Sequence, residues 1–215
     1  MLDWRQYETI LLDMDGTVLD LAFDNYFWRE LVPRCVARSR QMSQDKVRAE
    51  LFEHYASKRG SLDWYCLDYW TRQLNLDIRA LKNASSQRIR FLPGARKFLT
   101  AIIGMRKRLV LVTNAHADTL AVKKGVAGLE RYSDLFISSH DFGRAKEQAE
   151  FWPLLQSRIE FDLATTLLVD DSLPVLDAAA EFGLHNIVAV TRPDSRQPGN
   201  SPGVHRGVNG VVNLI

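Results

Sequence analysis

Two carboxylates stand one residue apart where an apolar segment of the chain ends. Residues 10–12 are Ile-Leu-Leu, and Asp13, Met14, Asp15 and Gly16 follow at once. Ligands of open parallel sheets bind at the carboxyl ends of the strands. Because side chains alternate along extended backbone, Asp13 and Asp15 are expected on one side and Met14 on the other. Gly16 permits a sharp turn. A plain polar turn is the alternative interpretation, since Asp and Gly both favour turns.

Two further apolar segments end in polar residues in the same way. Thr113 and Asn114 follow one of them, and Asp170 and Asp171 follow the other. Together with the first two acids, this pattern brings four carboxylates to one sheet edge, where they repel one another unless a cation lies among them. Oxygen ligands select a hard ion, and Mg²⁺ is the natural choice where phosphate is also bound. A basic side chain is needed there too, and Lys146 is the candidate.

The elements that must position these residues alternate between strand and helix. Short segments rich in Val, Ile and Leu, without polar alternation, are typical of parallel strands covered on both faces. Between them lie helical patterns, one after Pro93 and Gly94 and one over Pro174–Phe182 that stops at Gly183. This alternation predicts an α/β fold with a Rossmann-like parallel sheet. The expected strands are Thr9–Leu12, Leu109–Thr113, Leu135–Ser138, Thr166–Asp170 and Ile187–Val190.

The interval between the first two strands is far longer than a crossover needs. Residues 21–91 contain only helix-period patterns, so we expect a helical domain there, inserted into a core of residues 1–20 and 92–215. This interval holds 11 of the 21 Phe, Trp and Tyr residues, most of which must fill its small core. Near the carboxyl terminus, residues 191–213 are rich in Pro and Gly and predict a loop. The final Val-Val-Asn-Leu-Ile predicts an edge strand.

Composition excludes several classes of protein. Lys and Arg number 28 against 26 Asp and Glu, so nothing indicates a basic surface for nucleic acid. The two cysteines form no pairing framework, which favours a reducing cytoplasm, and the histidines show no zinc-binding spacing. No apolar run is long enough to span a membrane, and the first ten residues do not resemble a signal peptide. We expect a cytoplasmic globular protein; nothing in the sequence assigns its oligomeric state.

Taken together, the motifs resemble those of the haloacid dehalogenase superfamily. The four motifs are Asp-Met-Asp-Gly-Thr at 13–17, Leu-Val-Thr-Asn at 111–114, Lys146 and Leu-Val-Asp-Asp-Ser at 168–172, and they occur in the family's order. The resemblance implies that residues 21–91 form the family's helical cap. The family often has proline directly after its lysine, whereas Glu147 stands here, which affects the expected conformation of that loop.

The resemblance also implies a role for each motif residue. Asp13 would be the nucleophile, Asp15 the general acid and base, and Lys146 the cation that orients Asp13. Thr113 would hold the phosphoryl oxygens, with Asn114 beside it. An acid at position 15 is typical of the family's phosphatases and phosphomutases and is absent from its dehalogenases. The residues implied to hold Mg²⁺ are Asp13, Asp15, Asp170 and Asp171.

Two aromatic-rich stretches resemble a narrower group within the superfamily. Residues 20–28 and 62–70, with Thr-Asn-Ala-His at 113–116, are similar to the bacterial purine 5′-nucleotidases that act on GMP and IMP. This implies a nucleotide substrate, with Trp28 and Tyr65 as binding residues. Another small-molecule phosphatase, a sugar phosphomutase and a catalytically inactive binding module remain as alternatives. The aromatic candidates for stacking a base are Tyr26, Trp28, Trp64, Tyr65 and Tyr69.

Overall fold

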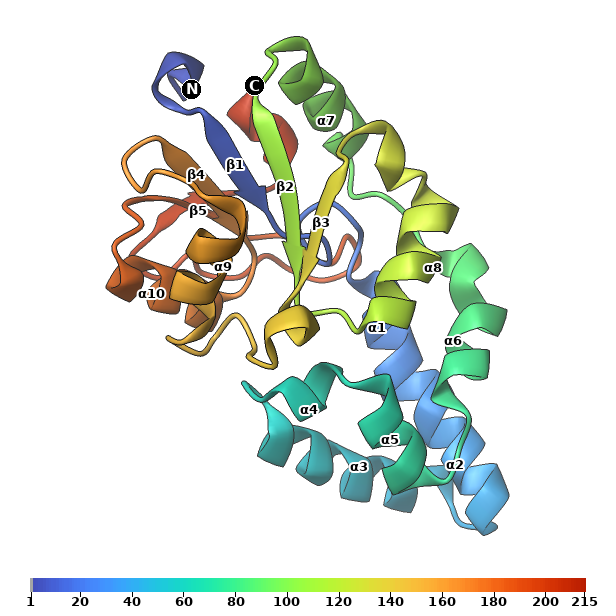
Figure 1. The fold of residues 1–215 in the computed structure, drawn as a ribbon. Coiled ribbons are helices and arrows are strands. Elements are labelled where there is room, and N and C mark those ends of the chain that lie inside the picture. Colours follow the sequence, from blue (N-terminus) through green and yellow to red (C-terminus); the bar gives the residue numbers. More distant parts are fainter. Residues whose placement is uncertain (1) are drawn as a thin grey trace.

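A six-stranded parallel sheet forms the centre of the computed structural model, which describes residues 2–215 (Figure 1). The strand order is β3-β2-β1-β4-β5-β6 and every neighbouring pair is parallel. The predicted α/β fold with a Rossmann-like sheet is therefore confirmed. The strands are β1 (Thr9–Leu12), β2 (Arg108–Thr113), β3 (Leu135–Ser138), β4 (Thr166–Asp170), β5 (Asn186–Val190) and β6 (Arg206–Val208).

The register of the central strands aligns their carboxyl ends. Leu12 in β1 pairs with Leu111 in β2 and with Val169 in β4. All four residues of β1 are buried, as expected for a strand covered on both faces. The polar residues that follow these three strands therefore emerge at one edge of the sheet.

Helices cover both faces of the sheet. Ile10 and Leu12 face a core that also contains Phe98 of α7, whereas Leu11 faces a second core formed with Trp152 of α9 and Leu176 of α10. In Figure 1, α7 and α8 accordingly lie on the opposite side of the sheet from α9 and α10. The helices of this part are α7 (Ala95–Gly104), α8 (Ala117–Ala127), α9 (Phe151–Ile159) and α10 (Leu173–Phe182). Short 3₁₀ turns occur at Trp4–Gln6, Leu129–Arg131 and Ser139–Phe142.

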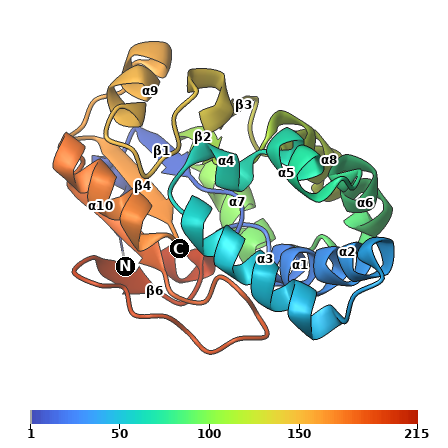
Figure 2. The same ribbon diagram turned by 90° about the horizontal axis from the view of Figure 1, so that it is seen from below.

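The long interval between β1 and β2 is helical and has a hydrophobic cluster of its own. Phe27, Leu51 and Trp70 are buried together there, apart from the two cores of the sheet. These helices lie beyond the carboxyl ends of the strands, and Figure 2 shows them from below. No helix within residues 2–215 is long and apolar enough to cross a membrane. The segments are α1 (Ala22–Tyr26), a π-helical turn (Phe27–Leu31), α2 (Val32–Arg40), α3 (Gln44–Lys58), α4 (Leu62–Tyr65), α5 (Leu67–Leu74), α6 (Ile78–Ser85) and a 3₁₀ turn (Ser86–Arg88).

The prediction of an edge strand at the end of the chain was wrong. Val211–Leu214 form a 3₁₀ turn instead, in which Val211 and Leu214 are buried. Residues three apart lie on the same face of a 3₁₀ helix, so this turn places both in the core that α7 also joins. The edge strand is β6, within the segment predicted to be a loop. Its three residues, Arg-Gly-Val, are too few to give an apolar pattern.

Gly94 provides a test of this packing at the start of α7. Its φ is +77°, and a Cβ atom there would lie 2.6 Å from Cβ of Val212 in the final turn. Because left-handed backbone and this contact both disfavour a side chain, Gly94→Ala should lower the free energy of unfolding by at least about 1–2 kcal/mol. Gly104→Ala, at the other end of α7 with open space around it, should leave that free energy unchanged or raise it by up to about 1 kcal/mol. Denaturant titration that gave both variants the same stability would contradict this packing.

Candidate active site

The turn after β1 directs the first two acids into a cavity. Asp13 and Asp15 both line it, whereas Met14 between them is fully buried in the core. Gly16 adopts a φ of +93°, and a Cβ atom there would lie 2.5 Å from Oδ2 of Asp171. Glycine is therefore needed both for the turn and for the close approach of Asp171, and the predicted sharp turn is confirmed.

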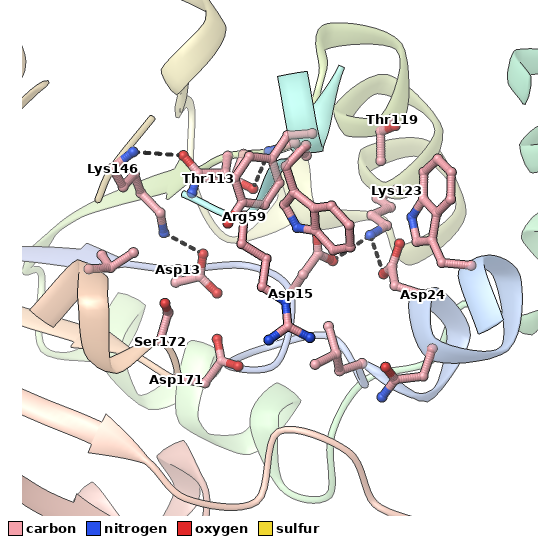
Figure 3. Close-up of a pocket in the computed structure, with 18 of the residues that line it drawn as sticks. Asp13, Asp15, Asp24, Arg59, Thr113, Thr119, Lys123, Lys146, Asp171 and Ser172 are labelled. Carbon is pink, nitrogen blue, oxygen red and sulfur yellow. Dashed lines mark hydrogen bonds and ion pairs between the residues drawn. The ribbon is translucent and has the colours of Figure 1, made fainter. Parts of the chain in front are cut away.

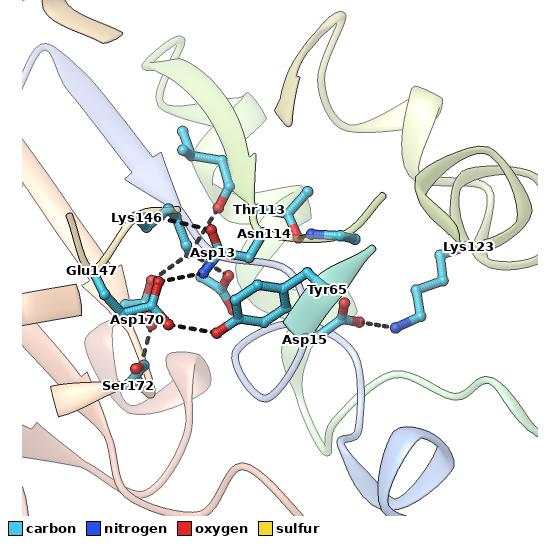
Figure 4. Close-up of polar contacts among 12 residues, drawn as sticks. Asp13, Asp15, Tyr65, Thr113, Asn114, Lys123, Lys146, Glu147, Asp170 and Ser172 are labelled. Carbon is cyan, nitrogen blue, oxygen red and sulfur yellow. Dashed lines mark hydrogen bonds and ion pairs between the residues drawn. The ribbon is translucent and has the colours of Figure 1, made fainter. Parts of the chain in front are cut away.

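Lys146 joins the acids of two strands. Its Nζ lies 2.6 Å from Oδ1 of Asp13 and 2.7 Å from Oδ2 of Asp170, and it also donates to the carbonyl of Val112 at 3.1 Å (Figure 4). The side chain of Lys146 is 3% exposed. Burial by itself lowers the pKa of an ammonium group, but the two carboxylates outweigh it and raise the pKa of Lys146. Lys146 is therefore a fixed positive charge between Asp13 and Asp170.

The carboxylates at this edge exceed the positive charge that balances them. Oxygens of Asp13, Asp170 and Asp171 lie within 4.8 Å of one another, and Lys146 is the cation that pairs with the first two. Burial, with Asp170 nearby, raises the pKa of Asp13 to about 7 despite Lys146. Burial, together with the nearby Asp13 and Asp170, raises the pKa of Asp171 well above its usual range. Oδ2 of Asp13 is buried without a hydrogen-bond partner among the described residues. A clustered set of carboxylate oxygens whose charge Lys146 only partly balances suits a hard divalent cation such as Mg²⁺.

Thr113 and Asn114 extend the site along the end of β2. Oγ1 of Thr113 accepts the N–H of Ala115 at 3.0 Å, so its own proton remains available to a ligand. Asn114 accepts the N–H of Lys146 at 2.9 Å and donates to Glu147 at 2.8 Å. Asn114 thus fixes the backbone that carries Lys146.

The predicted site residues line one cavity (Figure 3). Its volume of about 600 Å³ is within the usual range of small-molecule sites. The helical segment contributes aromatic side chains to its wall, including Trp64. The side chains of Tyr26 and Tyr69, also candidates from the sequence, are not part of this lining. The predicted site residues on the wall are Asp13, Asp15, Trp28, Tyr65, Thr113, Asn114, Lys146, Asp170 and Asp171.

Tyr65 makes a contact across the cavity that the sequence did not suggest. Its hydroxyl donates to Oε1 of Glu147 at 2.5 Å, and the other oxygen of Glu147 accepts from Asn114 (Figure 4). Glu147 is the residue that stands where related chains often have proline. Its carboxylate links the helical segment to the loop that carries Lys146.

A second group of charged residues beside Asp15 was also missed. Lys123 of α8 and Asp24 of α1 line the cavity, as does Lys82 of α6. The sequence gives little indication of this group. Each of the three is a single charged residue in a helical pattern, and the pattern does not show that their side chains come into contact. A further residue that the sequence did not indicate is Arg59, directly after α3, whose side chain lines the cavity (Figure 3).

The structure also gathers Cys66, His116 and His140, whose ligand atoms lie within 4.8 Å of one another. Their separation along the chain explains why the spacing of histidines and cysteines predicted no zinc site. Nδ1 of His116 already accepts the N–H of Asp118 at 3.3 Å at the start of α8. Burial, with His116 nearby, lowers the pKa of His140 to about 4, so His140 is neutral at pH 7.

Comparisons with known proteins agree with this geometry. The family model for haloacid dehalogenase-like hydrolases matches residues 7–183. The chain is 41% identical over 192 residues to the GMP/IMP nucleotidase YrfG of Escherichia coli K12, covering 89% of this chain and 86% of that protein. It is 28% identical to a phosphoglycolate phosphatase of Nitrosospira multiformis, over 83% of this chain and 81% of that one.

A solved structure shares the fold along almost the whole chain. The crystal structure of a haloacid dehalogenase phosphatase from Thermococcus onnurineus superposes with a TM-score of 0.79 at 20% identity, covering 96% of this chain and 95% of that chain. The match to the family model spans all four motifs, from Asp13 to Ser172. The chain therefore belongs to the haloacid dehalogenase-like hydrolases and is an enzyme of that family.

Proposed function

We propose that this enzyme is a Mg²⁺-dependent phosphatase that hydrolyses purine nucleoside 5′-monophosphates of the GMP and IMP type. The observation that carries the proposal is the ion-paired base of the cavity, where Lys146 fixes one oxygen of Asp13 and leaves the other, Oδ2, without a partner. A buried, oriented carboxylate oxygen facing a cavity is suited to attack a phosphorus atom.

The acids at the sheet edge would hold the metal. Oxygens of Asp13, Asp170 and Asp171 are close enough to share one ion, and Asp15 follows Asp13 in the same turn. When bound, Mg²⁺ would neutralise part of the charge on the carboxylates and on the phosphoryl group. Lys146 and Thr113 would add a positive charge and a hydroxyl donor for the phosphoryl oxygens.

The proposed reaction has two steps in which the chain's own residues move one proton. Oδ2 of Asp13 forms a bond to phosphorus while the bond from phosphorus to the ester oxygen breaks, giving an aspartyl-phosphate. Asp15 donates its proton to the departing alkoxide, which leaves as an alcohol. Asp15 then takes a proton from water, which attacks the same phosphorus, releases phosphate and restores the Asp13 carboxylate.

The aromatic wall of the cavity supports a nucleotide as substrate. We propose that residues 21–91 are a cap that binds the nucleoside, while residues 1–20 and 92–215 form the core that handles the phosphoryl group. Trp28 and Tyr65 line the cavity from the proposed cap. An aromatic ring stacks well on a flat purine base. The 41% identity to a protein named a GMP/IMP nucleotidase supports the same substrate class.

A panel of phosphate monoesters with Mg²⁺ tests the proposal directly. Release of inorganic phosphate from GMP and IMP, faster than from sugar phosphates, is the expected result. An isomerised sugar phosphate as product would instead identify a phosphomutase. A chain that releases phosphate from no monoester would be a binding module.

Substitution of Asp13 and substitution of Asp15 should impair catalysis in different ways. Asp13→Asn removes the attacking oxygen, so both hydrolysis and the aspartyl-phosphate should disappear. Asp15→Asn keeps the nucleophile but loses the proton donor, which should lower the rate about 10²- to 10⁴-fold. Steady-state rates would show this difference, and circular dichroism would verify that both near-isosteric variants fold. Equal residual turnover in the two variants would contradict separate roles.

Mg²⁺ should stabilise the fold as well as activate the enzyme. A ligand that binds only the native state raises the free energy of unfolding by about 2.7 kcal/mol at 100 times its dissociation constant. We therefore expect a higher Tm in saturating Mg²⁺ than in chelator. Asp170→Asn should reduce this shift, whereas Asp162→Asn, at an exposed loop away from the cavity, should keep it. A Tm that does not respond to Mg²⁺ would mean that these acids form no metal site.

Shortening a cavity aromatic should affect nucleotides selectively. Trp28→Ala or Tyr65→Ala should lower kcat/KM for purine monophosphates about 5- to 150-fold and leave a small monoester without a base nearly unaffected. Tyr26→Ala is the matched control, because Tyr26 lies outside the cavity wall and packs on Arg88. A parallel loss with both substrates and a lower Tm would show that these rings only fill the core.

A further inference from the structure

Four charged side chains, two of them buried and two half-buried, form a chain of ion pairs beside the catalytic turn. Nζ of Lys123 lies 2.7 Å from Oδ1 of Asp15 and 2.6 Å from Oδ2 of Asp24 (Figure 3). The other oxygen of Asp24 is 3.0 Å from Nζ of Lys82. When all four groups are ionised, the two carboxylates and the two ammonium groups balance in charge.

Each of the four residues comes from a different part of the fold. Asp15 belongs to the turn after β1, and Lys123 to α8 beside the sheet. Asp24 lies on α1 and Lys82 on α6, both in the helical segment. The side chains of Lys123 and Lys82 are only 2% and 5% exposed. Burying an unpaired ammonium group costs several kcal/mol, so Lys123 is held at this position by the two carboxylates it contacts.

We propose that Lys123 is a positioning residue for Asp15, and that Asp24 holds Lys123 in place for this role. The proposal rests on the proposed phosphatase function and adds to it. Lys123 fixes Oδ1 of Asp15 and thereby leaves Oδ2 as the oxygen that exchanges a proton with the leaving group. Lys123 itself touches no reacting atom. Because Asp24 comes from the helical segment, the orientation of Asp15 depends on the contact between that segment and the sheet.

The dependence of rate on the leaving group distinguishes positioning from packing. A nucleoside alkoxide needs a proton as it departs, whereas p-nitrophenolate departs without one. Lys123→Met, which removes the ammonium group and keeps most of the apolar side chain, should lower kcat/KM for IMP about 10- to 100-fold. The kcat/KM for p-nitrophenyl phosphate should change less than about threefold. Equal losses with the two substrates would overturn the proposal.

A double variant tests whether Lys123 acts through Asp15. In an Asp15→Asn background the proton donor is already lost, so Lys123→Met should cause little further loss with IMP. Coupling of this kind is what residues in contact show when one acts through the other. If the two losses multiplied instead, Lys123 would act independently of Asp15 and the proposal would be wrong.

Lys82→Met is the matched control. Lys82 is as buried as Lys123 and pairs with the same Asp24, but its ammonium makes no ion pair with Asp15. Lys82→Met should lower the Tm as Lys123→Met does while keeping the ratio of kcat/KM between the two substrates. A change in that ratio as large as the one in Lys123→Met would point to the charge of the whole cluster and overturn the specific role of Lys123.

Asp24→Asn is a second variant for the case that Lys123→Met does not fold. It leaves Lys123 with one carboxylate partner and should shift the ratio of kcat/KM between the two substrates in the same direction. An unchanged ratio would count against the proposal. The comparison uses any alkyl monoester that the wild type hydrolyses, so an incorrect assignment of the nucleotide would not affect it. A wild type without activity on any monoester would overturn the proposed function, and this proposal with it.

Discussion

An excess of buried negative charge at one edge of the sheet is the constraint on which the rest of this structure depends. Three carboxylates lie within 4.8 Å of one another, and Lys146 pairs with two of them. Such a cluster costs free energy in the absence of a further cation or of protonation. Burial, together with the nearby Asp170, accordingly raises the pKa of Asp13 to about 7. In the proposed function the same charge would attract a divalent cation, and through that cation an anionic phosphoryl group. An arrangement that is unfavourable for stability would then be useful for binding.

The sheet holds this cluster together against repulsion. Leu12 is aligned with Leu111 and with Val169, so hydrogen bonding between strands fixes the starting points of the polar residues that follow. The apolar residues of β1 are buried in the two cores on either side of the sheet. Hydrophobic burial therefore offsets the electrostatic cost at the strand ends. Gly16 lets the chain turn while the carboxylate of Asp171 comes close to it.

Much of the core could be predicted because its signals are local in the sequence. Each strand is a short apolar run, and each motif residue directly follows a strand or lies at a short distance from one. The final 3₁₀ turn and β6 were not predicted, since a strand of three residues and a turn of four leave almost no periodic pattern. The contacts of Lys123 with Asp24, and of Glu147 with Tyr65, join residues about 80 to 100 positions apart. A single charged residue on a helix is usually solvated, so only the three-dimensional arrangement shows that Lys123 is buried and that these residues are paired.

The central claim is that Asp13 forms a covalent bond to phosphorus, and its most direct test is chemical trapping. Rapid mixing of the enzyme with IMP and Mg²⁺, followed by acid quench and reduction with borohydride, converts an aspartyl-phosphate to homoserine. Mass spectrometry of the peptide that spans residues 9–29 then locates the modified residue. We predict homoserine at position 13, only when substrate is present and not in Asp13→Asn. An unmodified Asp13 throughout turnover, with phosphate still released, would contradict the account.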